Sequence, residues 1–456
     1  MQLSDRAALT AAAFCAGVVA AEAMRWLLRR RTGAHAALLM AKAPPESTIR
    51  LMTRLAIKHG AVNLSQGFPN EPPPTEMLAA GAGALLAGEN LAAAEAMGER
   101  LKAVMMVEAE KDQLNQYSFP FGMPLLRERL QAYFAAFYPE IPADADKNIT
   151  VVLGATEGFA VCLRALCSPG DNVAFFQPFH ELYPSQCTIF GLNPRAVTLR
   201  EGADGWSYDA AELDAALSGA RVLLLCTPHN PTGKIFSRAE LQQIGDACER
   251  HGVLVVTDEI YEHITFDGAT HTSIAQLSPA LAARTCVVSA LSKTARSTGW
   301  RVGWVVSPEA YTPAIRACHD QLVLQAPTPL QVGAAACLAL PRTFFAAIGD
   351  EYAEKMAVLA PALARAGFVQ RAPVHGAYYL FVDYRGVPAL QGLDPTAAAM
   401  KMTTDFKVAC VPGDNFYLGR AKGDAECGQK YIRFTFVRSL DVLRQAVAKL
   451  DAMAVK

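Results

Sequence analysis

The stretch from Gly252 to Glu259, GVLVVTDE, is a short apolar run that ends in two carboxylates. Similar runs occur elsewhere: ITVVLG from Ile149, NVAFF from Asn172, RVLLLC from Arg221, TCVVSA from Thr285 and VGWVV from Val302. Helix-like segments, such as residues 237–251, lie between some of them. Continuous apolar runs joined through helices are typical of a mostly parallel sheet with helices on both faces. The sequence therefore predicts an α/β fold.

Polar residues follow the carboxyl ends of four of these runs. They are Gly154, Ala155, Thr156 and Glu157 after the first, Pro228, His229 and Asn230 after LLLC, Asp258 and Glu259 after VLVVT, and Ser292 and Lys293 after VVSA. Open α/β sheets bind their ligands at this edge, because the strand ends leave a crevice there. We therefore expect the functional site at this edge.

The chain of 456 residues is long enough for two domains. A helical pattern over residues 47–60 stops at Gly60, and helix-forming residues dominate 81–111. After Pro329, two helix-sized blocks and an alternating strand, GAYYLFVDY, indicate a smaller α+β domain. The predicted division is an N-terminal extension (1–44), an arm and part of the small domain with an Ala-rich insertion (45–114), a large domain (115–330) and a small C-terminal domain (331–456).

Composition narrows the classes of protein. Hydrophobic residues make up 52% and charged residues 19%, which is typical of a globular chain. The formal net charge is −1, and Arg29–Arg31 is the only basic block, so nucleic-acid binding has no electrostatic support. The eleven cysteines are scattered and form no CxxC, which indicates buried thiols rather than disulfides or a metal site.

The N-terminus differs from the rest of the chain. Residues 7–21 are mostly small and apolar, and Arg25 and Arg29–Arg31 follow them. A run of about fifteen apolar residues is shorter than the roughly twenty that span a bilayer. An organellar transit peptide, a signal anchor and a plain helical extension all fit, so residues 7–31 are the only place where we expect membrane contact. A cytoplasmic, a mitochondrial and another organellar location all remain open.

Seven motifs in order reveal a resemblance. They are NLSQGFPN, NQYS, GATEG, TPHNPTGK, VTDEIYEH, SKTARSTGWRVGW and YIRFTFVR, within matching stretches from about Thr48 to Phe436. In them the chain resembles class I aminotransferases, which are fold-type I pyridoxal 5′-phosphate (PLP) enzymes, and in particular the kynurenine, glutamine and methionine aminotransferase group. The resemblance implies a large domain with a mostly parallel sheet, a smaller α+β domain, PLP as cofactor and a homodimer.

The resemblance also implies roles for catalytic residues. Lys293 matches the lysine that forms a Schiff base with PLP and then moves the proton between substrate and cofactor. Asp258 matches the partner of the pyridine nitrogen, and it keeps that nitrogen protonated so that the ring accepts electrons. Asn230 and Tyr261 match the donors to the phenolic oxygen of the cofactor.

Other matching positions would bind the phosphate and the ring of PLP. Ala155 and Thr156 begin a predicted helix, whose N–H groups and dipole favour an anion. Arg301 matches a basic phosphate contact, and Tyr117 matches a tyrosine that reaches the phosphate in the partner subunit. Phe179 matches the aromatic ring that stacks on the pyridine.

The substrate carboxylate is implied to bind at Arg433, with Gly67 and Asn230 beside it. An arginine within an apolar strand is costly unless an anion pairs with it. The alternative is a structural ion pair with an Asp or Glu.

Two departures from the family pattern stand out. Ala290 occupies the place of a serine that usually binds phosphate, while Ser289 and Ser292 flank it and could substitute. The segment between SQGFP and NQY is also longer than expected and rich in alanine.

The resemblance implies a ping-pong transfer of an amino group from an amino acid to a 2-oxo acid. Glutamine, methionine and aromatic amino acids, kynurenine included, are the expected donors. No second arginine for a distal carboxylate is identifiable, which disfavours a dedicated aspartate enzyme. One alternative is β-elimination from cysteine S-conjugates, which would release pyruvate and ammonia without an added 2-oxo acid. Another is a non-catalytic binding module with this fold.

Overall fold

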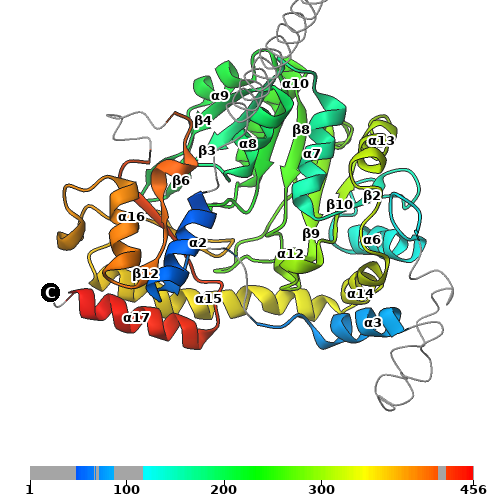
Figure 1. Cartoon of the computed structure of the whole chain (residues 1–456). Coiled ribbons are helices and arrows are strands. Elements are labelled where there is room, and N and C mark those ends of the chain that lie inside the picture. The colour runs from blue at the N-terminus through cyan, green and yellow to red at the C-terminus, as the bar shows by residue number, and fades with distance from the viewer. Residues whose placement is uncertain (1–47, 66, 68–70, 87–116, 420–427, 455–456) are drawn as a thin grey trace, which may run out of the picture. The chain divides into compact units, whose positions relative to one another are not determined.

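A seven-stranded sheet forms the centre of the computed structural model, which describes residues 48–65, 67, 71–86, 117–419 and 428–454 (Figure 1). In spatial order its strands are β2 (Ile149–Val152), β10 (Gly303–Val306), β9 (Thr285–Ala290), β8 (Leu254–Asp258), β7 (Ala220–Cys226), β3 (Asn172–Gln177) and β4 (Asn193–Thr198). Strand β10 is antiparallel to both of its neighbours, and the other pairs are parallel. The predicted mostly parallel sheet is confirmed.

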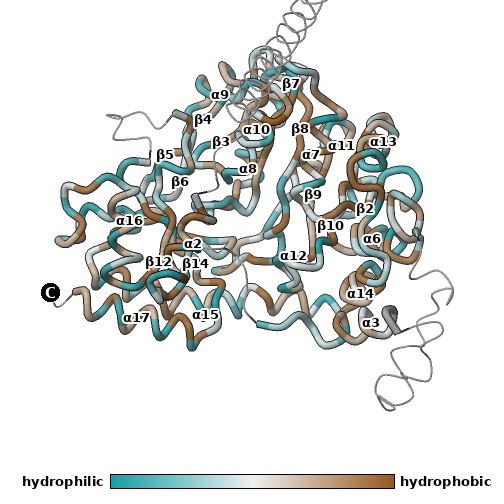
Figure 2. The backbone as a smooth tube through the Cα atoms, in the orientation of Figure 1, coloured by the Kyte–Doolittle hydropathy of each residue, from teal (hydrophilic) through white to brown (hydrophobic). Residues whose placement is uncertain are grey.

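All six predicted apolar runs are strands of this sheet, and Figure 2 shows the hydrophobic character of its centre. Most residues of β7, β8 and β9 are buried, as two-sided cover by helices requires. The sequence analysis missed β4, which is NPRAVT. Its first two residues, Asn193 and Pro194, are exposed because β4 is an edge strand, so it lacks the continuous apolar pattern.

The helices before residue 323 begin and end where local signals predict. Helix α10 (Arg238–His251) begins with a capping box between Ser237 and Glu240 and ends at Gly252 in the left-handed conformation. Helix α2 (Thr48–His59) ends before Gly60, whose φ is +59°. The other helices of this part are α3 (Thr75–Leu86), α6 (Pro124–Phe137), α7 (Ala155–Leu166), α8 (Leu182–Phe190), α9 (Ala210–Leu217), α11 (Pro279–Ala282), α12 (Leu291–Thr294) and α13 (Thr312–Leu322).

A second, smaller sheet forms from the C-terminal part of the chain. Strand β14 (Tyr431–Thr435) lies antiparallel between β11 (Tyr379–Asp383) and β13 (Val411–Pro412). All five residues of β11 are buried, so the predicted strand is correct but is covered on both faces. Two further pairs are β1 (Val62–Asn63) with β12 (Val408–Ala409), and β5 (Arg200–Gly202) with β6 (Gly205–Ser207). The helices of this part are α14 (Thr328–Leu338), α15 (Arg342–Arg365), α16 (Pro395–Thr404) and α17 (Leu440–Ala454).

Several predictions about organisation concern residues that the structure leaves out. The N-terminal segment with residues 7–31 and most of the Ala-rich insertion lie outside the described residues, so their roles stay predictions. Glu46–Lys456 forms one compact unit, and the predicted boundaries within it remain predictions. Within the described ranges no single helix is long and apolar enough to cross a membrane; α14 and α15 meet that criterion only as a pair, bent by 90°.

The described cysteines fit the predicted buried thiols. All nine are free, and eight of them are buried. Among the described residues, no group of three or more His, Cys, Asp or Glu side chains could hold a metal ion.

Candidate active site

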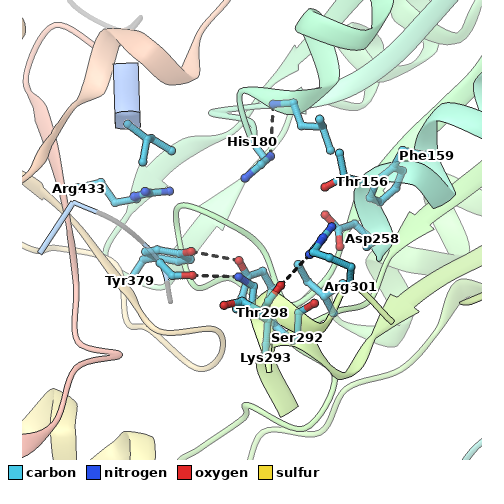
Figure 3. Close-up of a pocket in the computed structure, with 16 residues that line it drawn as sticks. Thr156, Phe159, His180, Asp258, Ser292, Lys293, Thr298, Arg301, Tyr379 and Arg433 are labelled. Carbon is cyan, nitrogen blue, oxygen red and sulfur yellow. Dashed lines mark hydrogen bonds between the residues drawn. The ribbon is translucent and has the colours of Figure 1, made fainter. Parts of the chain in front are cut away.

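A cavity of about 600 Å³ opens at the carboxyl ends of the central strands (Figure 3). Among its lining residues are eight that the sequence singled out: Gly67, Ala155, Thr156, Asp258, Tyr261, Lys293, Arg301 and Arg433. Figure 3 shows Arg433 and Tyr379 on one side and Asp258 and Arg301 on the other, with Lys293 between them and below. The predicted edge of the sheet is therefore where these side chains meet.

Lys293 lies in α12, directly after strand β9. Its Nζ donates a hydrogen bond to the carbonyl oxygen of Gly67 at 2.9 Å. Burial lowers the pKa of Lys293 to about 8, although the nearby carboxylate of Asp258 opposes this shift. A lysine with this pKa has an appreciable neutral fraction near pH 7, and the neutral amine is the nucleophilic form.

Asp258 ends strand β8 and faces the same cavity. The Tyr183 hydroxyl donates to Oδ2 at 2.6 Å, whereas Oδ1 is buried and receives no hydrogen bond from any described residue. Burial raises the pKa of Asp258 to about 6, and the bond from Tyr183 limits that rise. A buried acceptor without a donor costs about 1–3 kcal/mol. Oδ1 is thus suited to a ligand N–H group.

The start of helix α7, together with Arg301, forms a place in the cavity that suits an anion. Helix α7 begins with Ala155 and Thr156, whose N–H groups lack acceptors within the helix. Gly154 precedes them at φ +77°, and a Cβ there would lie 2.3 Å from Nη2 of Arg301, so only glycine fits. Arg301 Nη1 donates to the carbonyl oxygen of Thr298 at 2.9 Å, which holds the guanidinium beside the helix start.

The structure separates the two serines that flank Ala290. Ser292 lines the cavity. Ser289 instead donates its hydroxyl to Glu262 Oε1 at 3.0 Å and is buried. Ser292, not Ser289, is therefore the serine beside the predicted anion site.

On the other side, Arg433 projects from β14 and is only 1% exposed. Its Nη1 donates to Asn230 Oδ1 at 2.9 Å and its Nη2 to the carbonyl oxygen of Ser65 at 3.0 Å. Nε has no partner among the described residues, and none of their carboxylates forms a salt bridge with Arg433. A structural ion pair is therefore absent in this part of the chain, and the cation is open to a ligand carboxylate.

A row of hydroxyls connects the two sides. Asn230 Nδ2 donates to the Tyr261 hydroxyl at 3.4 Å, and the hydroxyls of Tyr261 and Tyr379 are 3.1 Å apart. The Tyr379 ring lies 4.3 Å from the Arg433 guanidinium carbon. A Cβ on Gly67 would lie 2.0 Å from the Tyr379 hydroxyl, which explains the glycine. Asn230 itself does not line the cavity but orients two residues that do.

Comparison with known proteins agrees with this geometry. The sequence model of the family described as "Aminotransferase class I and II" matches residues 76–450. The chain belongs to this family.

Relatives of this aminotransferase act on several amino acids. A kynurenine–oxoglutarate transaminase of Dictyostelium discoideum is 29% identical, over 86% of this chain and 90% of the relative. A methionine aminotransferase of Escherichia coli K12 is 32% identical, over 79% and 85%. The solved N-succinyldiaminopimelate aminotransferase of Mycobacterium tuberculosis superposes with a TM-score of 0.78 at 29% identity, covering 90% of this chain and 97% of that one. The fold is that of fold-type I aminotransferases, and the protein is a transaminase acting on amino acids and 2-oxo acids.

One predicted residue of this aminotransferase needs correction. Phe179 is not among the lining residues of the cavity; it is 2% exposed and packs edge-to-face on Phe175 at 5.2 Å. The neighbouring His180 lines the cavity instead (Figure 3). Its Nδ1 accepts a hydrogen bond from the Leu182 N–H at 3.3 Å, so the neutral ring carries its proton on Nε2. Burial lowers the pKa of His180 to about 4.

Tyr117 also lies outside this cavity. Its side chain is 76% exposed in the single chain. The implied contact with the phosphate of a partner subunit stays a prediction.

Sequence reasoning missed several residues of the aminotransferase cavity, among them His180 and Tyr379. Tyr379 belongs to GAYYLFVDY, which was predicted as a strand. Its place in the cavity was not predicted, because only folding brings this strand beside the strand that carries Arg433. His180 was harder to predict, because it directly follows Phe179, an aromatic residue that fits the role of the stacking ring equally well.

Proposed function

We propose that this aminotransferase binds PLP in the 600 Å³ cavity through Lys293 and transfers amino groups from glutamine, methionine and aromatic amino acids, kynurenine included. The observation that supports this most strongly is that Lys293 and Asp258 line the same cavity, and that the buried Oδ1 of Asp258 has no donor among the described residues. A pyridinium N–H would supply that donor. The chemistry of the donor set therefore fits the cofactor that the family implies.

Each part of the cofactor has a matching group in the cavity. The Lys293 amine would hold its aldehyde carbon, Asp258 its ring nitrogen, and the N–H groups of Ala155 and Thr156 with Arg301 its phosphate. When bound, PLP supplies an electron-accepting ring that stabilises negative charge on the substrate α-carbon. His180 provides the flat ring that was expected from Phe179.

The protein's own residues supply binding, orientation and proton transfer. Arg433 binds the substrate carboxylate through a charge-assisted contact, and Asn230 holds its guanidinium in place. Lys293 Nζ then takes the proton from the substrate α-carbon and would pass it to the cofactor, because a pKa of about 8 leaves part of the amine neutral near pH 7. The Tyr261 hydroxyl, oriented by Asn230, faces the same space.

The charges of the cavity support donors with uncharged side chains. Its lining cations are Lys293, Arg301 and Arg433, and each already has a role in this scheme. His180 stays neutral above about pH 5, because burial lowers its pKa. A distal substrate carboxylate would thus find no further cation among the described lining residues. Relatives named for kynurenine and methionine agree with such donors.

We also propose a homodimer in which Tyr117 contacts the cofactor phosphate of the partner subunit. The exposed Tyr117 and its neighbour Phe119, 57% exposed, support this proposal. Size-exclusion chromatography with light scattering, on wild type and on Tyr117→Phe, tests it. A monomer with full activity would contradict it.

Lys293→Ala tests the main proposal. The variant should lose transamination with methionine and 2-oxoglutarate, and should lose the visible absorption band of the lysine-bound cofactor. Lys147→Ala, which changes an exposed lysine, should keep both. Retained turnover in Lys293→Ala would refute the assignment. A panel of amino donors with 2-oxoglutarate and with pyruvate then ranks the substrates.

A further inference from the structure

A second cavity, of about 230 Å³, adjoins the turn that carries Lys293. Its lining residues are Thr294, Arg296, Phe344, Ala347, Ile348, Glu351 and Tyr352. None of them lines the active-site cavity. It is formed between the α12 turn and the first half of α15.

Three polar atoms at this cavity are buried and have no hydrogen-bond partner within the described part of the chain. They are Thr294 Oγ1, Arg296 Nε and the Tyr352 hydroxyl. Thr294 is 5% exposed and Tyr352 is 1% exposed. Buried polar atoms that are left unpaired destabilise the fold. Three of them around one cavity indicate a site that is built for an occupant.

The chemistry of the three groups favours an acceptor. Arg296 Nε–H is a donor, and burial raises the pKa of Tyr352, so its hydroxyl also keeps a proton to donate. The carboxylate of Glu351 is already engaged: Arg296 Nη1 donates to its two oxygens at 3.0 and 2.8 Å, and Lys355 Nζ donates at 2.9 Å. The unpaired groups of the cavity can therefore all donate: Arg296 Nε–H is a donor only, and the two hydroxyls can turn their protons toward an acceptor.

The apolar wall of the cavity and its volume limit which ligands could fit. Phe344, Ala347 and Ile348 give one apolar side. Pockets for drug-sized ligands start at about 300 Å³, so this cavity suits a molecule of a few heavy atoms. Glu351 pairs with Arg296 and Lys355, and Lys355 also pairs with Glu71 at 2.8 Å. Arg296 lines the cavity, and its unpaired Nε–H is a charged donor that favours an anionic acceptor.

We propose that this cavity is a binding site for a short aliphatic monocarboxylate, held by Thr294, Arg296 and Tyr352. The site goes beyond the proposed function, because it uses no residue of the active site. Its occupant would nevertheless adjoin two groups that position Lys293. Thr294 is the next residue in the chain, and the Tyr352 ring packs on Tyr378 at 5.5 Å. The Tyr378 hydroxyl donates to the Gly67 carbonyl oxygen at 3.1 Å, which also accepts from Lys293.

Calorimetric titration of the holoenzyme with propionate tests the site. We expect two sites per chain, one at Arg433 and one at this cavity. Thr294→Val and Tyr352→Phe keep side-chain shape but remove a donor, so each should weaken the second site about tenfold, as the loss of a hydrogen bond to a charged group predicts. Arg433→Gln should remove the first site and leave the second. Tyr208→Phe, which alters a tyrosine bonded to Glu240, should change neither.

Three results would overturn the proposal. The first is a single propionate site that Arg433→Gln abolishes, which would mean that only water fills the cavity. The second is unchanged binding in both Thr294→Val and Tyr352→Phe, with thermal unfolding confirming that each is folded. The third is equal affinity for propionamide, which would exclude the carboxylate as the recognised group. None of these results depends on the activity of Lys293→Ala, so failure here leaves the proposed function intact.

Discussion

The two sides of the active-site cavity are built in different ways. On one side, Asp258 ends a strand of a single sheet, and Lys293 and Thr156 follow the ends of two other strands of that sheet. On the other side, Tyr379 and Arg433 come from the small sheet. The first side depends on the register of adjacent parallel strands, whereas the second depends on how two sheets pack together. The residues proposed to bind the cofactor thus lie on the side whose geometry is set by one sheet alone.

The largest effect should follow from a change on the strand-end side. Asp258→Asn keeps the size of the side chain but removes its charge, so the ring nitrogen loses its anionic partner. We expect kcat/KM to fall on the order of a thousandfold, as for other preorganised electrostatic groups. Steady-state kinetics with measured cofactor content tests this. Asp246→Asn, an exposed carboxylate on α10, is the control. A fall of less than threefold would contradict the role of Asp258.

On the small-sheet side, Arg433→Gln should raise the KM for the amino donor about a hundredfold. The variant loses a buried charged contact, which typically costs about 2–5 kcal/mol. Cofactor absorption should stay as in the wild type, because the proposed role of Arg433 is to bind the substrate carboxylate and not the cofactor. Arg385→Gln is the control, since the Arg385 side chain is exposed and pairs with Asp383, the last residue of β11. If KM stays constant while cofactor is lost, the division into two sides is wrong.

Tyr379→Phe tests whether the two sides are linked through hydroxyls. The variant keeps the ring beneath Arg433 but removes the hydroxyl that bonds Tyr261. We expect about a tenfold loss of kcat, the size of one hydrogen bond, and a shifted pH midpoint of the visible cofactor band. Tyr384→Phe, which removes a bond to the carbonyl oxygen of Leu393, should shift neither quantity. An unchanged band midpoint in Tyr379→Phe would show that the hydroxyl row does not reach the cofactor.

The same contrast explains what sequence could predict. The six central strands were identified because they are apolar throughout, and the site residues at their ends follow from parallel topology. Strand β4 was missed, since an exposed edge removes that pattern. The ring over the cavity was placed one residue too early, at Phe179 rather than His180. Residues 178–181 have neither a strand nor a helix period, so nothing in the sequence tells which of two adjacent side chains points inward.

The smallest effect should come from that corrected residue. His180→Phe keeps a flat ring in the cavity and removes the Nε2–H donor, so cofactor binding should persist and donor preference should change about threefold, as for a single neutral hydrogen bond. The clearer signature is stability. His180 has a pKa of about 4 in the folded chain, and about 6.5 when unfolded. Between these values the unfolded chain binds a proton that the folded chain does not, so the wild type loses stability as pH falls through this window.

His180→Phe should lose less stability over the same window, as measured by urea unfolding at pH 7, 6, 5 and 4. The control is Phe179→Leu, which removes core packing on Phe175 and should lower stability equally at every pH. If both variants keep the wild-type slope against pH, the imidazole is not the buried group that resists protonation. Another residue of the loop would then have to provide the ring that packs against the cofactor.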